Sequence, residues 1–183
     1  ENGHDLLTTI DINIQDFADR TLRSKMKEKD VNGEIGVVVV MEVKTGDVKA
    51  IVNLTRGADG EYYEMKNNAV SDLWEPGSTF KTASIMIALE DGKIDVNKVV
   101  DCAPGIVKMH GRNMKDHNWH KGGYKELKVE DILGQSSNIG VSKIIDEAYG
   151  GNPSAYVDGL HRIGVGIPLN LPFVGRGEPY VPH

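Results

Sequence analysis

The segment from Ser78 to Asp91 constrains the fold most, because apolar side chains cover nearly every face of the helix it would form. Its apolar positions are Phe80, Ala83, Ile85, Met86, Ile87, Ala88 and Leu89. A helix of this kind has to be buried on most sides, and Gly92 is expected to end it. Lys81 lies in this segment, where an unpaired charge is unfavourable. The sequence therefore favours a specific role for the Lys81 amine.

Around this helix the sequence predicts a hairpin and several further helices. The valine-rich segment Glu34–Val43 and the segment Val48–Leu54 are typical of antiparallel strands, with a turn at Thr45-Gly46-Asp47. Further helices are expected at Thr8–Lys29, Leu127–Leu133, Ile139–Tyr149 and Ser154–Ile163. A two-stranded hairpin is marginally stable unless something covers or extends it, so these elements indicate part of an α+β fold.

Two segments show no clear periodicity. The polar stretch Thr55–Asp72, which includes Glu61-Tyr62-Tyr63-Glu64, is interpreted as an exposed loop. The stretch Asp101–Gly123 contains several Gly, Asn and His residues, and we expect it to be irregular with room for a short ribbon.

Length, charge and cysteine content exclude several classes of protein. The 183 residues suit one domain, or one domain with a small partner. With 21 Lys+Arg and 27 Asp+Glu the net charge is -6, and without a basic field we expect no nucleic-acid partner. The longest apolar run, Gly36–Met41, is far shorter than the ~20 residues of a membrane-spanning helix. The single cysteine, Cys102, excludes an intrachain disulfide.

Ser78 and Lys81 form a first candidate catalytic pair. Residues three apart on a helix share a face, and a serine hydroxyl becomes a nucleophile when an adjacent base takes its proton. Burial near a helix N-terminus disfavours a protonated amine, so Lys81 can be that base, and the free amides there can bind an oxyanion. The alternative is an N-cap serine followed by a solvated lysine.

Ser136, Ser137 and Asn138 form a second candidate group. A further hydroxyl beside a Ser/Lys pair can pass a proton to a leaving group, and a carboxamide can bind both a carbonyl and an amide of a substrate. The alternative is an N-cap for the helix that begins at Ile139, since serine and asparagine are preferred caps. Taken alone, the tripeptide favours the cap.

The order of the two groups carries more information than either alone. The motif segments are Glu75-Pro76-Gly77-Ser78-Thr79-Phe80-Lys81 and Gln135-Ser136-Ser137-Asn138-Ile139-Gly140. Together they resemble the transpeptidase domain of penicillin-binding proteins. Similar flanking segments are Leu7 to Asp11 with Gln15, the hairpin Val39 to Ala50, Gly164 to Gly166 and Gly177 to Pro179. The resemblance extends from Leu6 to Glu178, and the lack of a glycosyltransferase-like segment favours a class B member, a monofunctional transpeptidase.

The resemblance implies a fold and a set of roles. The fold is the α+β fold of penicillin-binding proteins and serine β-lactamases, with helices packed on an antiparallel sheet that is incomplete here. Ser78 is the nucleophile that the D-Ala-D-Ala end of a peptidoglycan stem peptide, or a β-lactam, acylates, and its backbone amide is one oxyanion donor. Lys81 accepts its proton and Ser136 passes a proton to the leaving group. Asn138 orients Lys81 and binds the substrate amide, and no cofactor is needed.

The family's third motif, Lys-Thr-Gly or a variant on a later strand, is missing after Asn138. Lys44-Thr45-Gly46 precedes the nucleophile and falls in the predicted hairpin turn, where glycine supplies a positive φ, so we interpret it as structural. We therefore expect residues 1–183 to be a partial transpeptidase domain, with the third motif and the remaining strands beyond His183. This leaves the activity of the fragment itself open.

The resemblance also implies partners and a location. The partners are peptidoglycan stem peptides, β-lactams and proteins of a cell-wall synthesis complex. The intact protein would work outside the cytoplasm, held at the membrane by an N-terminal helix absent from this sequence. Two alternatives stay open: a penicilloyl-serine β-lactamase or β-lactam sensor domain, which keeps the acylation step, and a non-catalytic scaffold module.

A group of potential metal ligands needs a separate account. It comprises Cys102, His110, Asp116, His117 and His120, and zinc takes thiolate, imidazole and carboxylate ligands. Their spacing matches no standard ligand pattern. We expect a polar rim of the active site or an exposed loop here, and no metal.

Overall fold

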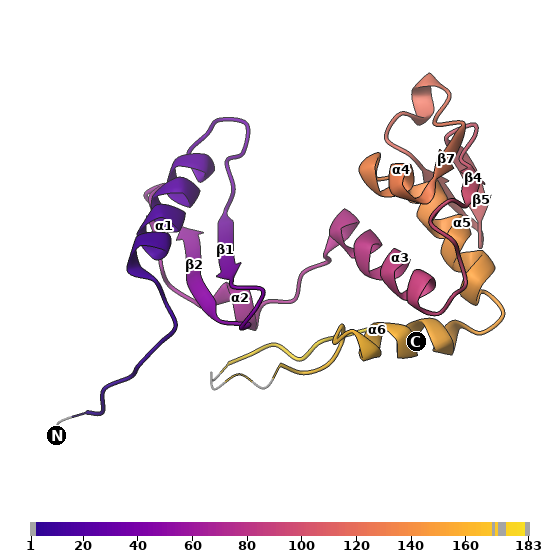
Figure 1. Ribbon diagram of the computed structural model, residues 1–183. Helices are drawn as coiled ribbons and strands as arrows, with labels where there is room; N and C mark the ends of the chain where they lie inside the picture. The colour runs from indigo at the N-terminus through magenta and orange to yellow at the C-terminus, as the bar shows by residue number, and fades with distance from the viewer. Residues whose placement is uncertain (1–2, 170, 172–174, 182–183) are drawn as a thin grey trace. The chain divides into compact units, whose positions relative to one another are not determined.

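The computed structural model describes residues 3–169, 171 and 175–181 of the chain (Figure 1). The described residues form two compact units, one from residues 3–73, 171 and 175–178 and the other from residues 74–169 and 179–181. Among these described residues, no helix combines the length and the apolar character needed to cross a membrane.

The first unit is an antiparallel sheet with a long helix packed on it (Figure 1). Its elements are α1 (Ile12–Met26), β1 (Ile35–Met41), β2 (Val48–Arg56), β3 (Tyr62–Tyr63) and α2 (Asn68–Ser71). The sheet order is β1-β2-β3. Asp11 caps α1, because its carboxylate accepts the N–H groups of Asn13 and Ile14 at 2.9 and 3.2 Å.

The core of this unit lies between α1 and β2. Alternate residues of a strand point to the same face, and Ala50, Val52 and Leu54 of β2 are all fully buried. They pack with Ala18 and Met26 of α1. The hairpin and the first helix predicted from the sequence are confirmed, with the helix shorter at both ends than Thr8–Lys29.

Part of the segment that was expected to be an exposed loop pairs with the sheet instead. β2 continues to Arg56, and β3 pairs with it through Tyr62 and Tyr63. Tyr62 is buried, with its hydroxyl 2.9 Å from the Met26 carbonyl oxygen and 3.0 Å from that of Gly33. The prediction of an exposed loop is therefore wrong here, because these two carbonyls supply the partners that let a tyrosine be buried among polar neighbours.

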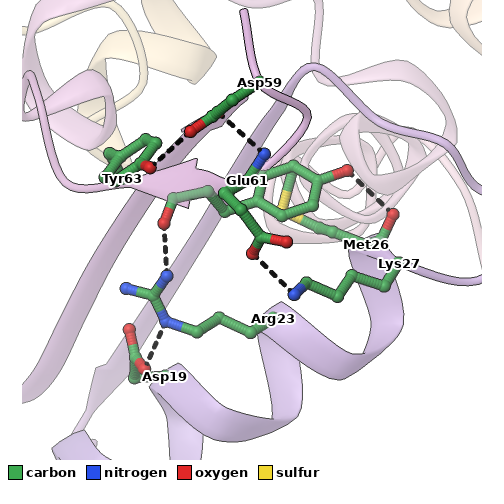
Figure 2. Close-up of polar contacts among 8 residues, drawn as sticks. Asp19, Arg23, Met26, Lys27, Asp59, Glu61 and Tyr63 are labelled. Carbon is green, nitrogen blue, oxygen red and sulfur yellow. Dashed lines mark hydrogen bonds and ion pairs between the residues drawn. The ribbon is translucent and has the colours of Figure 1, made fainter. Parts of the chain in front are cut away.

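Charged side chains of α1 reinforce this attachment (Figure 2). Arg23 donates to the Asp19 carboxylate at 2.7 Å and to the carbonyl oxygen of Tyr62 at 2.5 Å. The Lys27 ammonium lies 2.7 Å from the Glu61 carboxylate, as Figure 2 shows. The helix, β3 and the preceding turn are thus joined by polar as well as apolar contacts.

The second unit consists of helices and two short ribbons (Figure 1). Its helices are α3 (Phe80–Glu90), α4 (Val129–Gly134), α5 (Asn138–Tyr149) and α6 (Pro153–Arg162), with 3₁₀ turns η1 (Gly77–Thr79) and η2 (Trp119–Lys121). The ribbons pair β4 (Val99–Asp101) with β7 (Glu126–Lys128), and β5 (Ile106–Met109) with β6 (Arg112–Lys115). The predicted helices are confirmed, except that Leu127 and Lys128 belong to β7 and not to a helix. The stretch expected to be irregular contains the β5–β6 ribbon.

The core of this unit is built around α3 and α5. It includes Ile85 and Ala88 of α3, Ile132 of α4, and Ile139 and Ile144 of α5. The prediction that α3 is buried on most sides holds, with Thr82, Met86 and Glu90 exposed. The helix that carries Lys81 is therefore fixed by packing against the helix that follows the second motif.

The tripeptide Lys44-Thr45-Gly46 lies in the turn between β1 and β2, in the first unit. Gly46 has a φ of 77° and its N–H donates to the Glu42 carbonyl at 2.8 Å. A positive φ at this position suits glycine, which agrees with a structural role for the tripeptide.

Candidate active site

Ser78 lies in η1, immediately before α3. Gly77 has a φ of 60° and allows the sharp entry into this turn. The Thr79 hydroxyl donates to the Pro76 carbonyl at 2.6 Å and holds the turn together. Ser78 is therefore exposed at the entry to the helix, and Lys81 follows on the same face within the first turn of α3.

The Lys81 amine lies among three oxygen atoms. Its Nζ is 3.3 Å from Ser78 Oγ, 2.9 Å from Ser136 Oγ and 2.6 Å from the Ser136 carbonyl oxygen. A protonated lysine has three donors, so these oxygens can satisfy all of them. A neutral amine keeps two donors for Ser136 and presents its lone pair to the Ser78 hydroxyl.

Burial lowers the pKa of Lys81 below its ordinary value, because the charged form loses hydration. The negative charge of Asp116 acts in the opposite direction and partly offsets this effect. A lysine with a lowered pKa is more often neutral at a given pH. The environment of Lys81 thus favours the form that can accept a proton from Ser78.

Ser136 occupies an unusual backbone conformation between α4 and α5. Its φ is 52°, which costs a non-glycine residue about 1–2 kcal/mol. The turn is held by hydrogen bonds from the Ser136 N–H to Leu133 (3.0 Å) and from the Ser137 N–H to Ile132 (2.9 Å). In this conformation Ser136 turns both its carbonyl oxygen and its hydroxyl to Lys81.

Ser137 is the N-cap of α5. Its fully buried hydroxyl accepts the Gly140 N–H at 2.9 Å and donates to Asp116 Oδ2 at 2.9 Å. The cap interpretation of the tripeptide is therefore correct for Ser137, while Ser136 is free to contact Lys81. The cap and the candidate site occupy neighbouring residues, so the two interpretations are compatible.

Asn138 begins α5 and borders the same pocket as Lys81. The pocket has a volume of about 230 Å³ and is lined by Gly77, Phe80, Lys81, Ser84, Met114, Asn138, Val141 and Ser142. Asn138 Nδ2 donates to the Lys115 carbonyl at 2.7 Å. Among the hydrogen bonds of the described residues none joins Asn138 to Lys81, so the orienting role of Asn138 stays a prediction.

The potential metal ligands have separate partners. His110 Nε2 lies 2.7 Å from Asp146 Oδ1, and His117 Nε2 lies 3.3 Å from the Tyr124 hydroxyl. In the described ranges no three His, Cys, Asp or Glu side chains gather as a metal site would need. Asp116 and Cys102, expected in a polar rim or an exposed loop, are instead buried. Asp116 lies beside the second motif, a position that sequence reasoning missed. Its contact to Ser137 spans 21 positions and leaves no local signal.

Comparison with known proteins shows to which family this chain is similar. Residues 36–180 match the family model described as the penicillin-binding protein transpeptidase domain. The peptidoglycan D,D-transpeptidase FtsI of Escherichia coli is 33% identical over 99% of this chain and 30% of that protein. FtsI of Buchnera aphidicola is 30% identical over 99% of this chain and 31% of that protein. The chain thus spans about a third of the length of these relatives.

Solved structures show the same fold. A peptidoglycan glycosyltransferase from Burkholderia ambifaria superposes with a TM-score of 0.82 at 26% identity, covering 97% of this chain and 51% of that one. The transpeptidase domain of Burkholderia pseudomallei penicillin-binding protein 3 gives a TM-score of 0.78 at 25% identity, covering 97% and 48%. The α+β fold predicted from the sequence is confirmed. The chain therefore belongs to the penicillin-binding protein transpeptidase family.

Proposed function

We propose that this chain carries the nucleophile and the proton-transfer residues of a peptidoglycan D,D-transpeptidase. The observation that supports this most is the position of Lys81 Nζ, 3.3 Å from Ser78 Oγ and 2.9 Å from Ser136 Oγ. One amine within reach of two hydroxyls can take a proton from the first and return it through the second. This is the proton path that acyl transfer through a serine ester requires.

In the proposed acylation step, Ser78 Oγ bonds to the carbonyl carbon of the penultimate D-Ala of a stem peptide. The hydroxyl proton moves to Lys81 Nζ, and the Ser78 backbone N–H donates to the oxyanion. The C–N bond to the terminal D-Ala then breaks. The departing amine takes its proton from Lys81 through the Ser136 hydroxyl, which leaves an acyl ester on Ser78.

In the second step an acceptor amine of another stem peptide attacks the ester carbonyl. Its proton returns through Ser136 and Lys81 to the departing Ser78 oxygen, and the new amide bond is the cross-link. Asn138 is proposed to bind the substrate amide from the pocket that it shares with Lys81. A β-lactam would acylate Ser78 in the same way, with its opened ring still attached to the acyl group.

The proposal covers more than these residues. Residues 1–183 are proposed to be the part of the transpeptidase domain with the first two motifs, which is consistent with their share of the relatives' length. The Lys-Thr-Gly motif would then lie in the remainder. As the resemblance implies, the intact protein is proposed to work outside the cytoplasm, anchored at the membrane, with partners in a cell-wall synthesis complex.

Transpeptidation can be tested directly with a D-Ala-D-Ala peptide and an acceptor amine. We expect release of D-Ala together with a new amide, and loss of both products in Ser78→Ala and Lys81→Ala. Ser154→Ala, which changes an exposed serine in α6, is the matched control and is expected to keep the activity. Release of D-Ala without any new amide would contradict the transfer reaction and leave only hydrolysis.

The alternatives make different predictions in the same protein. A β-lactamase turns over a chromogenic β-lactam many times, because it activates a water to cleave the ester. A transpeptidase opens about one equivalent of the β-lactam per protein chain and then stays acylated. A sensor domain would be acylated but would form no cross-link, and a scaffold module would not be acylated by either compound.

A further inference from the structure

Asp116 is a buried carboxylate directly beneath the second motif. It is only 1% exposed, although a buried charge is costly unless it is well satisfied. Oδ2 accepts the Ser137 hydroxyl at 2.9 Å, and Oδ1 accepts the Ile139 N–H at 3.1 Å. Both donors belong to the first turn of α5 or its cap, where the helix dipole favours a negative charge. In the described part of the chain Asp116 forms no salt bridge.

The backbone of Asp116 is fixed independently of its side chain. Its N–H donates to the Gly105 carbonyl at 3.0 Å, and its carbonyl accepts the Trp119 N–H at 3.1 Å. Gly105 in turn packs directly on the backbone of Gly123, since a Cβ on Gly105 would lie 2.4 Å from the Gly123 Cα. The carboxylate therefore projects from a rigid segment.

The two bonds of Asp116 hold the residues that follow Ser136. Ser136 has a positive φ, a conformation that persists only where its surroundings fix it. Because Ser137 and Ile139 are tied to Asp116, the chain enters α5 in one orientation. That orientation turns both Ser136 oxygens to Lys81 Nζ, which also contacts Ser78 Oγ.

The charge of Asp116 also acts on Lys81. The other residues that line the pocket beside Lys81 carry no group that titrates near neutral pH. They are Gly77, Phe80, Ser84, Met114, Asn138, Val141 and Ser142. From α6, Tyr156 contacts Ser84 through its hydroxyl at 2.7 Å. Within the described ranges, Asp116 is the charged group that raises the pKa of Lys81 against the effect of burial.

We propose that Asp116 is a positioning residue of this active site, which holds Ser136 against Lys81 through Ser137 and Ile139. This inference rests on the proposed acyl transfer, because the pair that it positions is the proton path of that reaction. Among the described residues no hydrogen bond joins Asp116 to Ser78 or Lys81, so Asp116 acts through its neighbours.

Two variants separate the charge of Asp116 from its hydrogen bonds. Asp116→Asn keeps the shape and removes the charge. Ser137→Ala keeps the charge and removes the hydrogen bond to Asp116, together with the capping bond from the Gly140 N–H. Asp131→Asn, which changes an exposed carboxylate in α4, is the control. In each protein the rate constant of acylation by a β-lactam is measured against pH, and the Lys81 amine is titrated by NMR after ¹³C labelling of lysine.

We expect Asp116→Asn to shift the Lys81 titration and the acidic limb of the rate profile to lower pH, because the opposing charge is gone. We expect both Asp116→Asn and Ser137→Ala to lower the plateau rate at high pH roughly 10–100-fold through misplacement of Ser136. Ser137→Ala should leave the titration unchanged, and Asp131→Asn should change neither quantity.

A plateau rate that Ser137→Ala leaves unchanged would overturn the positioning role, and this variant decides the question even if Asp116→Asn does not fold. A titration of Lys81 that Asp116→Asn leaves unchanged would overturn the role of the charge. The NMR titration needs no acylation, so it tests the role of Asp116 separately from the proposed acyl transfer. An absence of acylation in the full transpeptidase domain counts against the proposed function, whereas the shifted titration still tests Asp116.

Discussion

Lys81 and Ser136, 55 positions apart in the sequence, are joined by two hydrogen bonds from one amine, at 2.6 Å to the carbonyl oxygen and 2.9 Å to the hydroxyl. The carbonyl bond holds the amine in place whatever happens to the hydroxyl. The hydroxyl is then free to exchange protons with the amine or with a leaving group. One partner, the carbonyl oxygen, fixes the amine, and the other, the hydroxyl, can exchange protons with it. This arrangement suits a lysine that accepts and returns a proton in one reaction.

The rate of acylation of Ser78 should rise with pH as Lys81 loses its proton. Since burial lowers the pKa of Lys81, the neutral amine is populated at lower pH than for an ordinary lysine, with its value of 10.5. The acidic limb of the rate profile should therefore have an apparent pKa below 10.5. Stopped-flow acylation with a chromogenic β-lactam measures it. Lys81→Ala should abolish this limb, and Lys93→Ala, at an exposed site, should not.

Ser136→Ala should lower the acylation rate by about 10²–10⁴, the usual contribution of a proton-transfer group. Ser136→Gly should cause the same loss of rate. The two variants should differ in stability, because glycine tolerates the φ of 52° and alanine does not. We expect Ser136→Gly to be about 1 kcal/mol more stable than Ser136→Ala in urea unfolding. Equal stabilities would contradict the backbone conformation assigned to Ser136.

Gly123→Ala should destabilise the second unit severely. Its Cβ would lie 2.2 Å from the Gly105 Cα, and the φ of Gly123 is 68°. The backbone has to move, at a cost of about 2–5 kcal/mol from overlap and the positive φ together. Gly134→Ala is the control, because a Cβ there meets nothing within 4 Å. Thermal unfolding of the two variants should separate them clearly, and similar melting temperatures would argue against the close contact.

Tyr149 should make the stability of the protein depend on alkaline pH. Burial, with a hydrogen bond to Asp91 at 2.7 Å, raises the pKa of Tyr149 from 10.0 to about 12. The folded protein thus favours the neutral phenol. This stabilisation is complete below pH 10 and is lost as the pH rises through about 12. We expect a decrease of about 2–3 kcal/mol in the free energy of unfolding across this range. In Tyr149→Phe this part of the decrease should be absent.

The first two motifs could be predicted because their chemistry is local. Ser78 and Lys81 are three residues apart, and the apolar segment around Lys81 marks it as unusual within a single helix. Ser136 and Ser137 lie at a helix start that the sequence also indicates. The residues alone could not separate the tasks of the two serines, which the resemblance assigned. The backbone turn that separates a capping serine from one that contacts Lys81 depends on the tertiary position of Asp116.

The elements that the sequence did not predict are those whose stability comes from distant partners. Tyr62 lies among polar residues, and its burial depends on carbonyl oxygens of Met26 and Gly33 about 30 positions earlier. For the β5–β6 ribbon the sequence allowed a short ribbon but did not place its strands, because β5 and β6 are four residues each, too short for an alternating pattern to stand out. Local propensity and periodicity do not reveal contacts between residues that are distant in the sequence.

The most direct test of the account is the mass of the intact protein after incubation with a β-lactam, followed by peptide mapping. The account predicts a single adduct of one β-lactam per chain, on Ser78, and no adduct in Ser78→Ala, while Ser154→Ala is labelled like the unmodified protein. A protein of the full transpeptidase domain should give the same site with a faster reaction. An adduct on another residue, or none in the full domain, would contradict the assignment of Ser78 as the nucleophile.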